Sequence, residues 1–169
     1  MSIEIIGLSG RFPESRNIEE FWDKLCSGED LVTISDKRFV PGTQGIPERT
    51  GTIPDIEFFD GSLYGINPKQ CAKMDPQFRL MLDCVREAIL DAGMVPSNLR
   101  GTNTGVYTGG CFSDHQSAVL YDPESVDGRE MVGNAMSHLA NRVSFTFDFK
   151  GPSYNVDTAC SSSMVAFDR

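Results

Sequence analysis

The stretch SYNVDTACSSSM, residues 153–164, decides how this chain is interpreted. Residues 154–156 predict a short strand, and residues 160–167 have the composition of a helix. The residues that flank Cys160 are small, as a sharp turn from a strand into a helix requires. The sequence therefore predicts an elbow at which a helix begins at Cys160.

A cysteine at such an elbow has two useful chemical properties. Free backbone N–H groups and the positive end of the helix dipole favour its thiolate over its thiol. The N–H of Cys160 itself can point at the oxygen of a bound carbonyl and stabilise an oxyanion. The same cysteine could instead be only a small residue that fills a tight turn. Physical arguments alone leave the nucleophile and the structural interpretation open.

Outward from the elbow, residues 76–92 predict the clearest helix in the chain. Asp75 is suited to cap its N-terminus, and Pro76 is suited to its first position. Gly93 ends it. An apolar stripe at helical spacing predicts the core face of this helix, formed by Phe78, Met81, Leu82, Val85, Ile89 and Ala92.

Weaker patterns predict the remaining elements. Strands are expected at residues 3–6 and 104–108, and a second helix at residues 134–143. Asn17 should cap a helix that ends at Gly28, because Glu20 stands at capping-box spacing.

Three further segments are expected to be loops or extended chain. Residues 29–66 are rich in proline and glycine and predict long loops. Residues 121–129 look like a surface connection. In residues 145–149 phenylalanines alternate with polar residues, which predicts an extended chain.

Composition is typical of one globular domain, with 169 residues, 40% hydrophobic and 23% charged. The net charge of −9 argues against a nucleic-acid partner, which usually needs a basic face. No apolar run approaches the roughly 20 residues that span a bilayer, and no secretory signal opens the chain. We expect a cytoplasmic protein that is not associated with a membrane.

The five cysteines are odd in number, and no two of them form a CxxC pair. We therefore expect neither a disulfide framework nor a metal site.

The heptapeptide DTACSSS, residues 157–163, resembles the active-site signature of β-ketoacyl synthases in multidomain fatty acid and polyketide synthases. Residues 68–70 and 147–152 are more similar to the animal fatty acid synthase type, and an animal polyketide synthase is the alternative. Further segments resemble the family in order along the chain: residues 5–13, 21–25, 67–70, 74–80, 99–106, 140–145 and 148–153.

The resemblance implies an α/β, thiolase-like fold of layered αβαβα type and a homodimer. Residues 1–169 would be the N-terminal part of the domain, truncated just after the active-site cysteine. The family's two assisting histidines and its lysine follow the cysteine. We therefore expect this chain alone to be inactive.

The implied activity is that of a β-ketoacyl-acyl carrier protein synthase, an acyltransferase of fatty acid biosynthesis. An acyl group passes from the phosphopantetheine arm of acyl carrier protein to Cys160, the nucleophile. A decarboxylative Claisen condensation with a malonyl thioester follows. The partners are thus a carrier protein and acyl and malonyl thioesters, and no cofactor is bound directly.

Three other residues could be assigned to the active site or to the structure. Met131 resembles a family position near the acyl pocket of the opposite subunit. His115 and His138 both precede the cysteine and match neither histidine motif of the family, so we expect them to be structural or at the surface.

Three alternatives compete with this interpretation. A non-catalytic ketosynthase-like binding subunit would replace the nucleophile, often with glutamine, whereas Cys160 is present. A coenzyme A-dependent acyltransferase of thiolase shape is disfavoured by the carrier-dependent signature. A cysteine hydrolase ranks last, because no C-G-x-C-[WY] pattern surrounds Cys160.

Overall fold

The structure is a computed structural model that describes residues 3–34, 40, 42, 45, 47–120 and 134–169. Its helices are α1 (Ile18–Ser27), α2 (Pro68–Lys73), α3 (Pro76–Asp91), α4 (Asp114–Leu120), α6 (His138–Phe147) and α7 (Ser162–Phe167). Its strands are β1 (Thr33–Ile34), β2 (Arg49–Thr50), β3 (Val106–Gly109) and β4 (Ser153–Val156). Three 3₁₀ turns complete the order, η1 (Gly61–Tyr64), η2 (Pro96–Leu99) and η3 (Ala159–Ser161).

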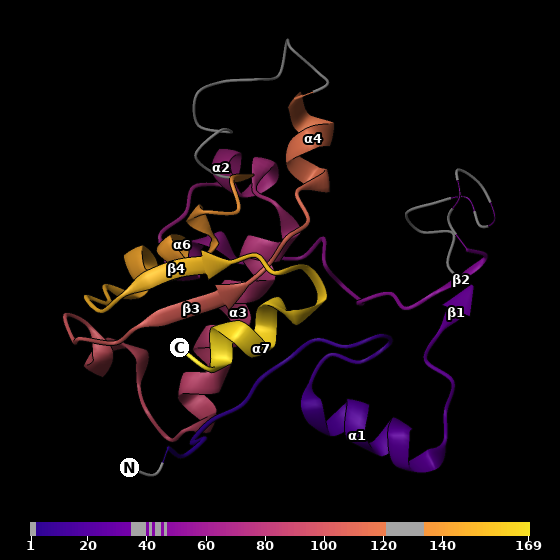
Figure 1. Cartoon of the computed structure of the whole chain (residues 1–169), viewed down its shortest axis with the longest axis horizontal. Helices are drawn as coiled ribbons and strands as arrows, with labels where there is room; N and C mark the ends of the chain where they lie inside the picture. The colour runs from indigo at the N-terminus through magenta and orange to yellow at the C-terminus, as the bar shows by residue number, and fades with distance from the viewer. Residues whose placement is uncertain (1–2, 35–39, 41, 43–44, 46, 121–133) are drawn as a thin grey trace.

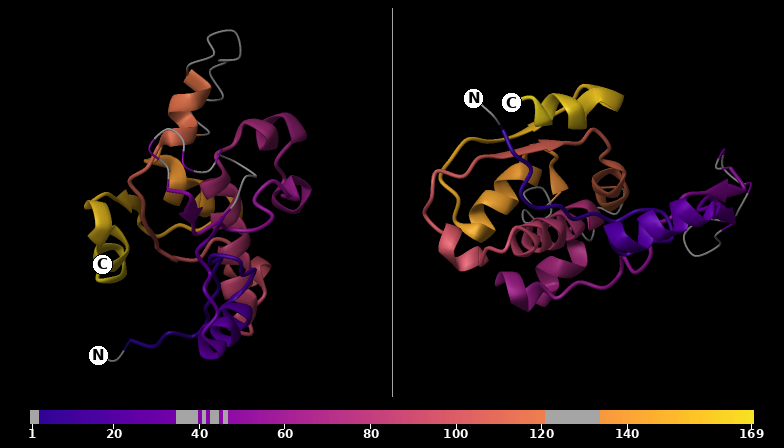
Figure 2. Two further views of the ribbon diagram at one scale, coloured as in Figure 1. Left: turned by 90° about the vertical axis from the view of Figure 1, so that its right-hand side faces the viewer. Right: turned by 90° about the horizontal axis from the view of Figure 1, so that it is seen from below.

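The centre of the molecule is layered around a parallel pair of strands. β3 pairs with β4 in a register that joins Val106 to Ser153 and Gly109 to Val156. α7 covers one face of this pair, and α6 with α3 covers the other (Figures 1 and 2). Because the strands are parallel, both end at the same edge of the sheet.

The core lies where α3 packs on α6. Phe78 and Leu82 are completely buried, and the 16-residue helix α3 confirms the helix expected at residues 76–92. The side chain of Asp75 accepts a hydrogen bond from the Gln77 N–H, so it caps the helix as expected. The core cluster is Ile66, Met74, Phe78, Leu82, Ile89, Leu139, Val143, Phe147 and Phe149.

The strand expected at residues 3–6 is wrong. This segment forms no strand, and the side chains of Ile3, Ile5 and Ile6 are 91%, 63% and 63% exposed. A strand needs a backbone partner, and this segment follows α3 instead, where the Leu8 N–H donates to Asp91 at 2.9 Å. Ile6 lines a mainly apolar cavity of about 710 Å³ together with residues of α3, β3 and α7.

The extended chain expected at residues 145–149 is also wrong. α6 begins at His138 and continues to Phe147, four residues beyond the expected end at residue 143. Asp148 then adopts a left-handed conformation, with φ at 58°. This turn stacks the ring of Phe149 on that of Phe147 at 5.6 Å, so both rings are buried although the spacing of two resembles a strand.

The described residues between positions 11 and 60 form a lobe beside these layers (Figure 1). In it, α1 confirms the helix capped by Asn17, whose side chain accepts from the Glu20 N–H at 2.8 Å. The loops expected over residues 29–66 are confirmed for most of the described part. The exceptions are the two-residue antiparallel ladder of β1 and β2 and the 3₁₀ turn η1. The surface connection expected at residues 121–129 lies outside the described residues.

Within the described ranges, no helix is both long enough and apolar enough to cross a membrane.

Candidate active site

The elbow around Cys160 departs slightly from the expected geometry. β4 ends at Val156, Cys160 sits in the 3₁₀ turn η3, and the α-helix begins two residues after the cysteine, at Ser162. Ala159, immediately before it, has a left-handed backbone with φ at 54°. This conformation is uncommon for a residue with a Cβ and costs about 1 kcal/mol or more, so the surroundings must hold it in place.

Hydrogen bonds from two serines hold the turn. The buried hydroxyl of Ser162 accepts from the Thr158 N–H at 2.9 Å and donates to the Ala159 carbonyl at 2.7 Å. The hydroxyl of Ser161 donates to the Thr158 carbonyl at 2.8 Å. The serines that follow Cys160 therefore fix the backbone on both sides of it.

A close backbone contact fixes the turn to the sheet. A Cβ on Gly109, the last residue of β3, would lie 2.6 Å from the Ser162 carbonyl carbon and from the Ser163 nitrogen. Only glycine allows the end of β3 to approach the first turn of α7 this closely.

Asn155 ties the two strand ends together. Its amide nitrogen donates to the Gly110 carbonyl at 2.8 Å, and its amide oxygen accepts from the Thr108 hydroxyl at 2.9 Å. Sequence reasoning missed both Gly109 and Asn155. The glycine pair at residues 109–110 was a visible signal, but its partner across the fold was not.

The thiol of Cys160 is exposed, and within the described part of the chain its sulfur accepts and donates no hydrogen bond. Its backbone N–H is equally unpaired among these residues, whereas the Ala159 N–H donates to Asp157 Oδ1 at 3.1 Å and the Ser161 N–H to Thr158. Cys84 differs, because burial between α3 and residues 9–11 raises the pKa of its thiol. The turn thus presents a thiol and a free donor together.

The other residues named from the sequence are not assembled around this thiol. His115 lies on α4, with its Nε2 3.4 Å from the Lys73 carbonyl oxygen. His138 begins α6, and its Nδ1 is buried without a hydrogen-bond partner among the residues described. Met131 falls outside the described residues. No group of three or more histidine, cysteine or acidic residues in the described ranges could hold a metal ion.

Comparison with known proteins identifies the family to which this chain is similar. The model of the β-ketoacyl synthase N-terminal domain matches residues 1–169. Fatty acid synthase from the goose Anser anser anser is 49% identical over 98% of this chain and 47% of its own length. A phenolphthiocerol/phthiocerol polyketide synthase from Mycobacterium tuberculosis is 40% identical over 97% of this chain, which is 9% of that protein.

Solved structures agree with the sequence comparison. The ketosynthase from module 6 of the bacillaene synthase of Bacillus subtilis matches 96% of this chain with a TM-score of 0.83 and 32% identity. An oxazolomycin ketosynthase domain from Streptomyces albus matches 96% with a TM-score of 0.82 and 29% identity. The chain spans 27% and 30% of these two structures.

The match therefore covers the whole chain but only part of each relative. It includes the elbow, the parallel strand pair and the helices on both faces. The chain belongs to the β-ketoacyl synthase family, and its layers are the N-terminal portion of the thiolase-like fold of ketosynthases.

Proposed function

We propose that this chain carries the nucleophile of a β-ketoacyl-acyl carrier protein synthase of fatty acid biosynthesis. The observation that carries the proposal is the elbow itself: an exposed thiol at Cys160 beside its own unpaired backbone N–H. The family match supports a condensing acyltransferase. The substrates follow from the signature DTACSSS, residues 157–163.

In the first half-reaction the Cys160 thiolate attacks the carbonyl carbon of an acyl thioester on the phosphopantetheine arm of the carrier protein. The tetrahedral intermediate places a negative charge on the carbonyl oxygen, and the Cys160 N–H can donate to it. Collapse breaks the carbon–sulfur bond to the carrier, whose sulfur leaves as a thiolate and takes up the proton that the Cys160 thiol had released. The thioester on the carrier and the thioester on Cys160 are similar in energy, so the acyl-enzyme intermediate is not too stable to react further.

In the second half-reaction a malonyl thioester loses carbon dioxide, and its electron pair forms an enolate at the α-carbon. This carbon attacks the thioester on Cys160, a carbon–carbon bond forms, and the cysteine leaves as the free thiol. The product is a β-ketoacyl thioester on the carrier. The assisting histidines and lysine of the family have no counterpart that we can assign among residues 1–169.

The test is acylation of the complete condensing domain by an acyl thioester, followed by intact mass spectrometry and peptide mapping. We expect one acyl group on Cys160 and loss of condensation by about three orders of magnitude or more in Cys160→Ser. Cys111→Ser is the matched control, because Cys111 follows the neighbouring strand β3, and it should leave condensation intact. Acylation of another residue, with Cys160→Ser still active, would contradict the proposal.

Two related functions remain distinguishable by experiment. An animal polyketide synthase ketosynthase would use the same thiol and differ in the product released. A non-catalytic ketosynthase-like binding subunit would not be acylated at all. The exposed thiol favours a catalytic role over the binding subunit.

We also propose that the protein is a homodimer that pairs through β4. The Val106 and Gly110 N–H groups donate to the carbonyls of Pro152 and Val156, so alternate residues of β4 face β3. By this alternation, the backbone groups of Ser153 and Asn155 face the other edge, where no strand lies among the described residues. An unpaired edge is a ready template for a second copy.

Asn155→Pro tests this dimer, because proline removes an outward N–H and leaves the ladder to β3 intact. Asn155→Ala is the control, since it removes the same side-chain bonds but keeps the N–H. We expect sedimentation of the complete protein to give monomer for the proline variant and dimer for the alanine variant. A dimeric proline variant would refute pairing through β4. It would not affect the assignment of Cys160 as the nucleophile.

A further inference from the structure

A second site lies away from Cys160. It is a pocket of about 390 Å³ between η1, α3, η2 and the end of α6. Its lining comes from α3, α6 and the turns η1 and η2 and includes no residue of β4, η3 or α7. Any ligand here would therefore act separately from acyl transfer at the elbow. The residues that line it are Leu63, Tyr64, Gly65, Arg86, Pro96, Ser97, Arg100, Thr146 and Phe147.

The pocket carries positive charge in a chain whose net charge is −9. Its lining holds two guanidinium groups and no carboxylate. Arg86 makes no hydrogen bond or ion pair with any residue that the structure describes. Arg100 forms one long ion pair, 3.8 Å from Asp148 Oδ2, and the other oxygen of that carboxylate is bonded to Lys150 at 2.5 Å.

Two other acids nearby are also engaged. Glu87 accepts hydrogen bonds from Arg11 at 2.7 and 2.5 Å, and these bonds lower its pKa, as the charge of Arg86 does to a lesser extent. Asp83 accepts a hydrogen bond from the Tyr64 hydroxyl at 2.5 Å. Burial, and then this bond, raise the pKa of Tyr64, so its hydroxyl stays neutral at physiological pH. Arg86 thus has no ion-pair partner among the described residues and Arg100 has only the long one, so both guanidinium groups keep donors for an external anion.

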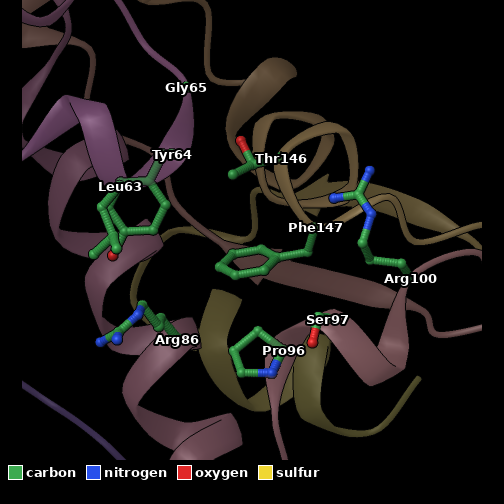
Figure 3. A pocket seen from close by; sticks show the side chains of 9 residues that line it. All are labelled: Leu63, Tyr64, Gly65, Arg86, Pro96, Ser97, Arg100, Thr146 and Phe147. Carbon is green, nitrogen blue, oxygen red and sulfur yellow. The ribbon is translucent and has the colours of Figure 1, made fainter.

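The shape adds a second requirement on the ligand. Figure 3 shows Arg86 and Arg100 at opposite ends of the pocket, with the rings of Phe147 and Pro96 between them. Phe147 is held in place by the core, where its ring stacks on Phe149. The hydroxyls of Ser97 and Thr146 make no hydrogen bonds within the described part of the chain. A complementary ligand has an apolar middle and an acidic group at each end.

We propose that this pocket docks an acidic segment of a partner protein, with an apolar side chain seated over Phe147 between two carboxylates. Guanidinium groups suit carboxylates because they donate two parallel hydrogen bonds. A free small molecule fits less well, since such ligands are usually enclosed and the side chain of Arg100 is 57% exposed. A protein segment gains further contacts outside the pocket. This inference does not depend on the proposed function.

The test is an NMR titration of the complete, isotope-labelled protein with a capped pentapeptide, aspartate–glycine–leucine–glycine–aspartate. We expect the side-chain signals of Arg86 and Arg100 to shift. Arg86→Glu and Arg100→Glu should each weaken binding roughly tenfold, about the worth of one hydrogen bond to a charged group. Arg169→Glu makes the same charge change at an exposed position beyond α7 and should have no effect.

A charge swap separates recognition from damage to the fold. The double variant Arg86→Glu, Arg100→Glu should bind the peptide in which lysines replace the aspartates, which a misfolded protein would not do. Equal binding by wild type and both single variants would overturn the proposal, as would no shift in the wild type. If free pimelate, a dicarboxylate with an apolar spacer, bound as tightly as the peptide, the site would belong to a small dianion and the protein segment would be wrong.

Discussion

The layered centre and the lobe of residues 11–60 are held together in opposite ways. In the centre, α3 and α6 bury apolar side chains completely, as at Phe78 and Val143. In the lobe, α1 buries no residue, and the side chain of Trp22 is 63% exposed. The lobe has the stacked rings of Phe12 and Phe21 and the buried Leu31, but polar bonds make most of its connections. The centre thus rests on burial, and the lobe rests mainly on hydrogen bonds and ion pairs.

Glu14 shows how the lobe is tied. Its carboxylate accepts from the hydroxyls of Thr33 and Thr52 at 3.2 and 3.1 Å, and its carbonyl accepts from the Lys24 ammonium. One residue thus joins α1 to both sides of the β1–β2 ladder. Such bonds contribute modestly in water, so the lobe should open locally before the centre unfolds.

The largest effect is expected from Phe78→Ala in the centre. Phe78 is completely buried, and its removal should lower the free energy of unfolding by about 3–5 kcal/mol. Phe78→Leu keeps most of the volume and should cost less than about 1.5 kcal/mol. Urea denaturation of the complete protein measures both. Equal costs for the two variants would mean that the centre does not depend on close packing.

Glu14→Ala should have an intermediate effect that is confined to the lobe. We expect a loss of about 1–2 kcal/mol, because two hydroxyl donors lose a charged acceptor. Hydrogen exchange should rise at amides of the lobe and stay unchanged in α3. Faster exchange in α3 as well would show that the two parts unfold together and would break the comparison.

Arg11→Met tests the link between the two parts. Arg11 donates to both oxygens of Glu87, at 2.7 and 2.5 Å, and the hydrogen bond from Arg11 is the main reason that the pKa of Glu87 is lowered. We expect a cost of about 1 kcal/mol, because the Glu87 side chain is 39% exposed.

The pH dependence of this link has a definite sign. A carboxyl with a lowered pKa stabilises the fold above its ordinary value, 4.5 for Glu87, and loses this contribution as the pH falls through the lowered folded value. The difference in stability between wild type and Arg11→Met should therefore shrink as the pH falls from about 4.5 through the lowered pKa of Glu87. A difference that stayed constant down to strong acid would exclude Glu87 as the partner.

The smallest effect is expected from Trp22→Ala. Because the side chain is 63% exposed, the change should alter the free energy of unfolding by less than about 0.5 kcal/mol. Thermal denaturation of the complete protein checks this. A cost above about 2 kcal/mol would show that another surface covers α1.

The sequence predicted the features that depend on neighbours along the chain. The caps at Asn17 and Asp75 and the stripe that begins at Phe78 are local patterns, and they are confirmed. The strand at residues 3–6 failed because a strand is defined by a partner, which an apolar run does not supply. Phe147 misled the prediction because a left-handed turn at Asp148 brought alternating rings to one side of a helix.

The candidate site also has features that the sequence predicts and features that it does not. The small residues around Cys160 are enough by themselves to indicate a tight turn. The serine bonds at Ser161 and Ser162 refine that turn, and they too are local. The approach of Gly109 to α7 and the two arginines of the pocket join distant segments, so no pattern in the sequence could reveal them.

The contact at Gly109 has a mechanical consequence. Side chains between two elements can change rotamer, and the elements can then slide past each other. Two backbones in direct contact cannot adjust in this way. The first turn of α7 is therefore seated on the end of β3, and Cys160 is carried with the strand. A displacement of β3 and β4, such as strand pairing at the free edge of β4 would impose, is transmitted to the sulfur as a rigid movement. The position of the Cys160 thiol would then depend on the position of β3 and β4.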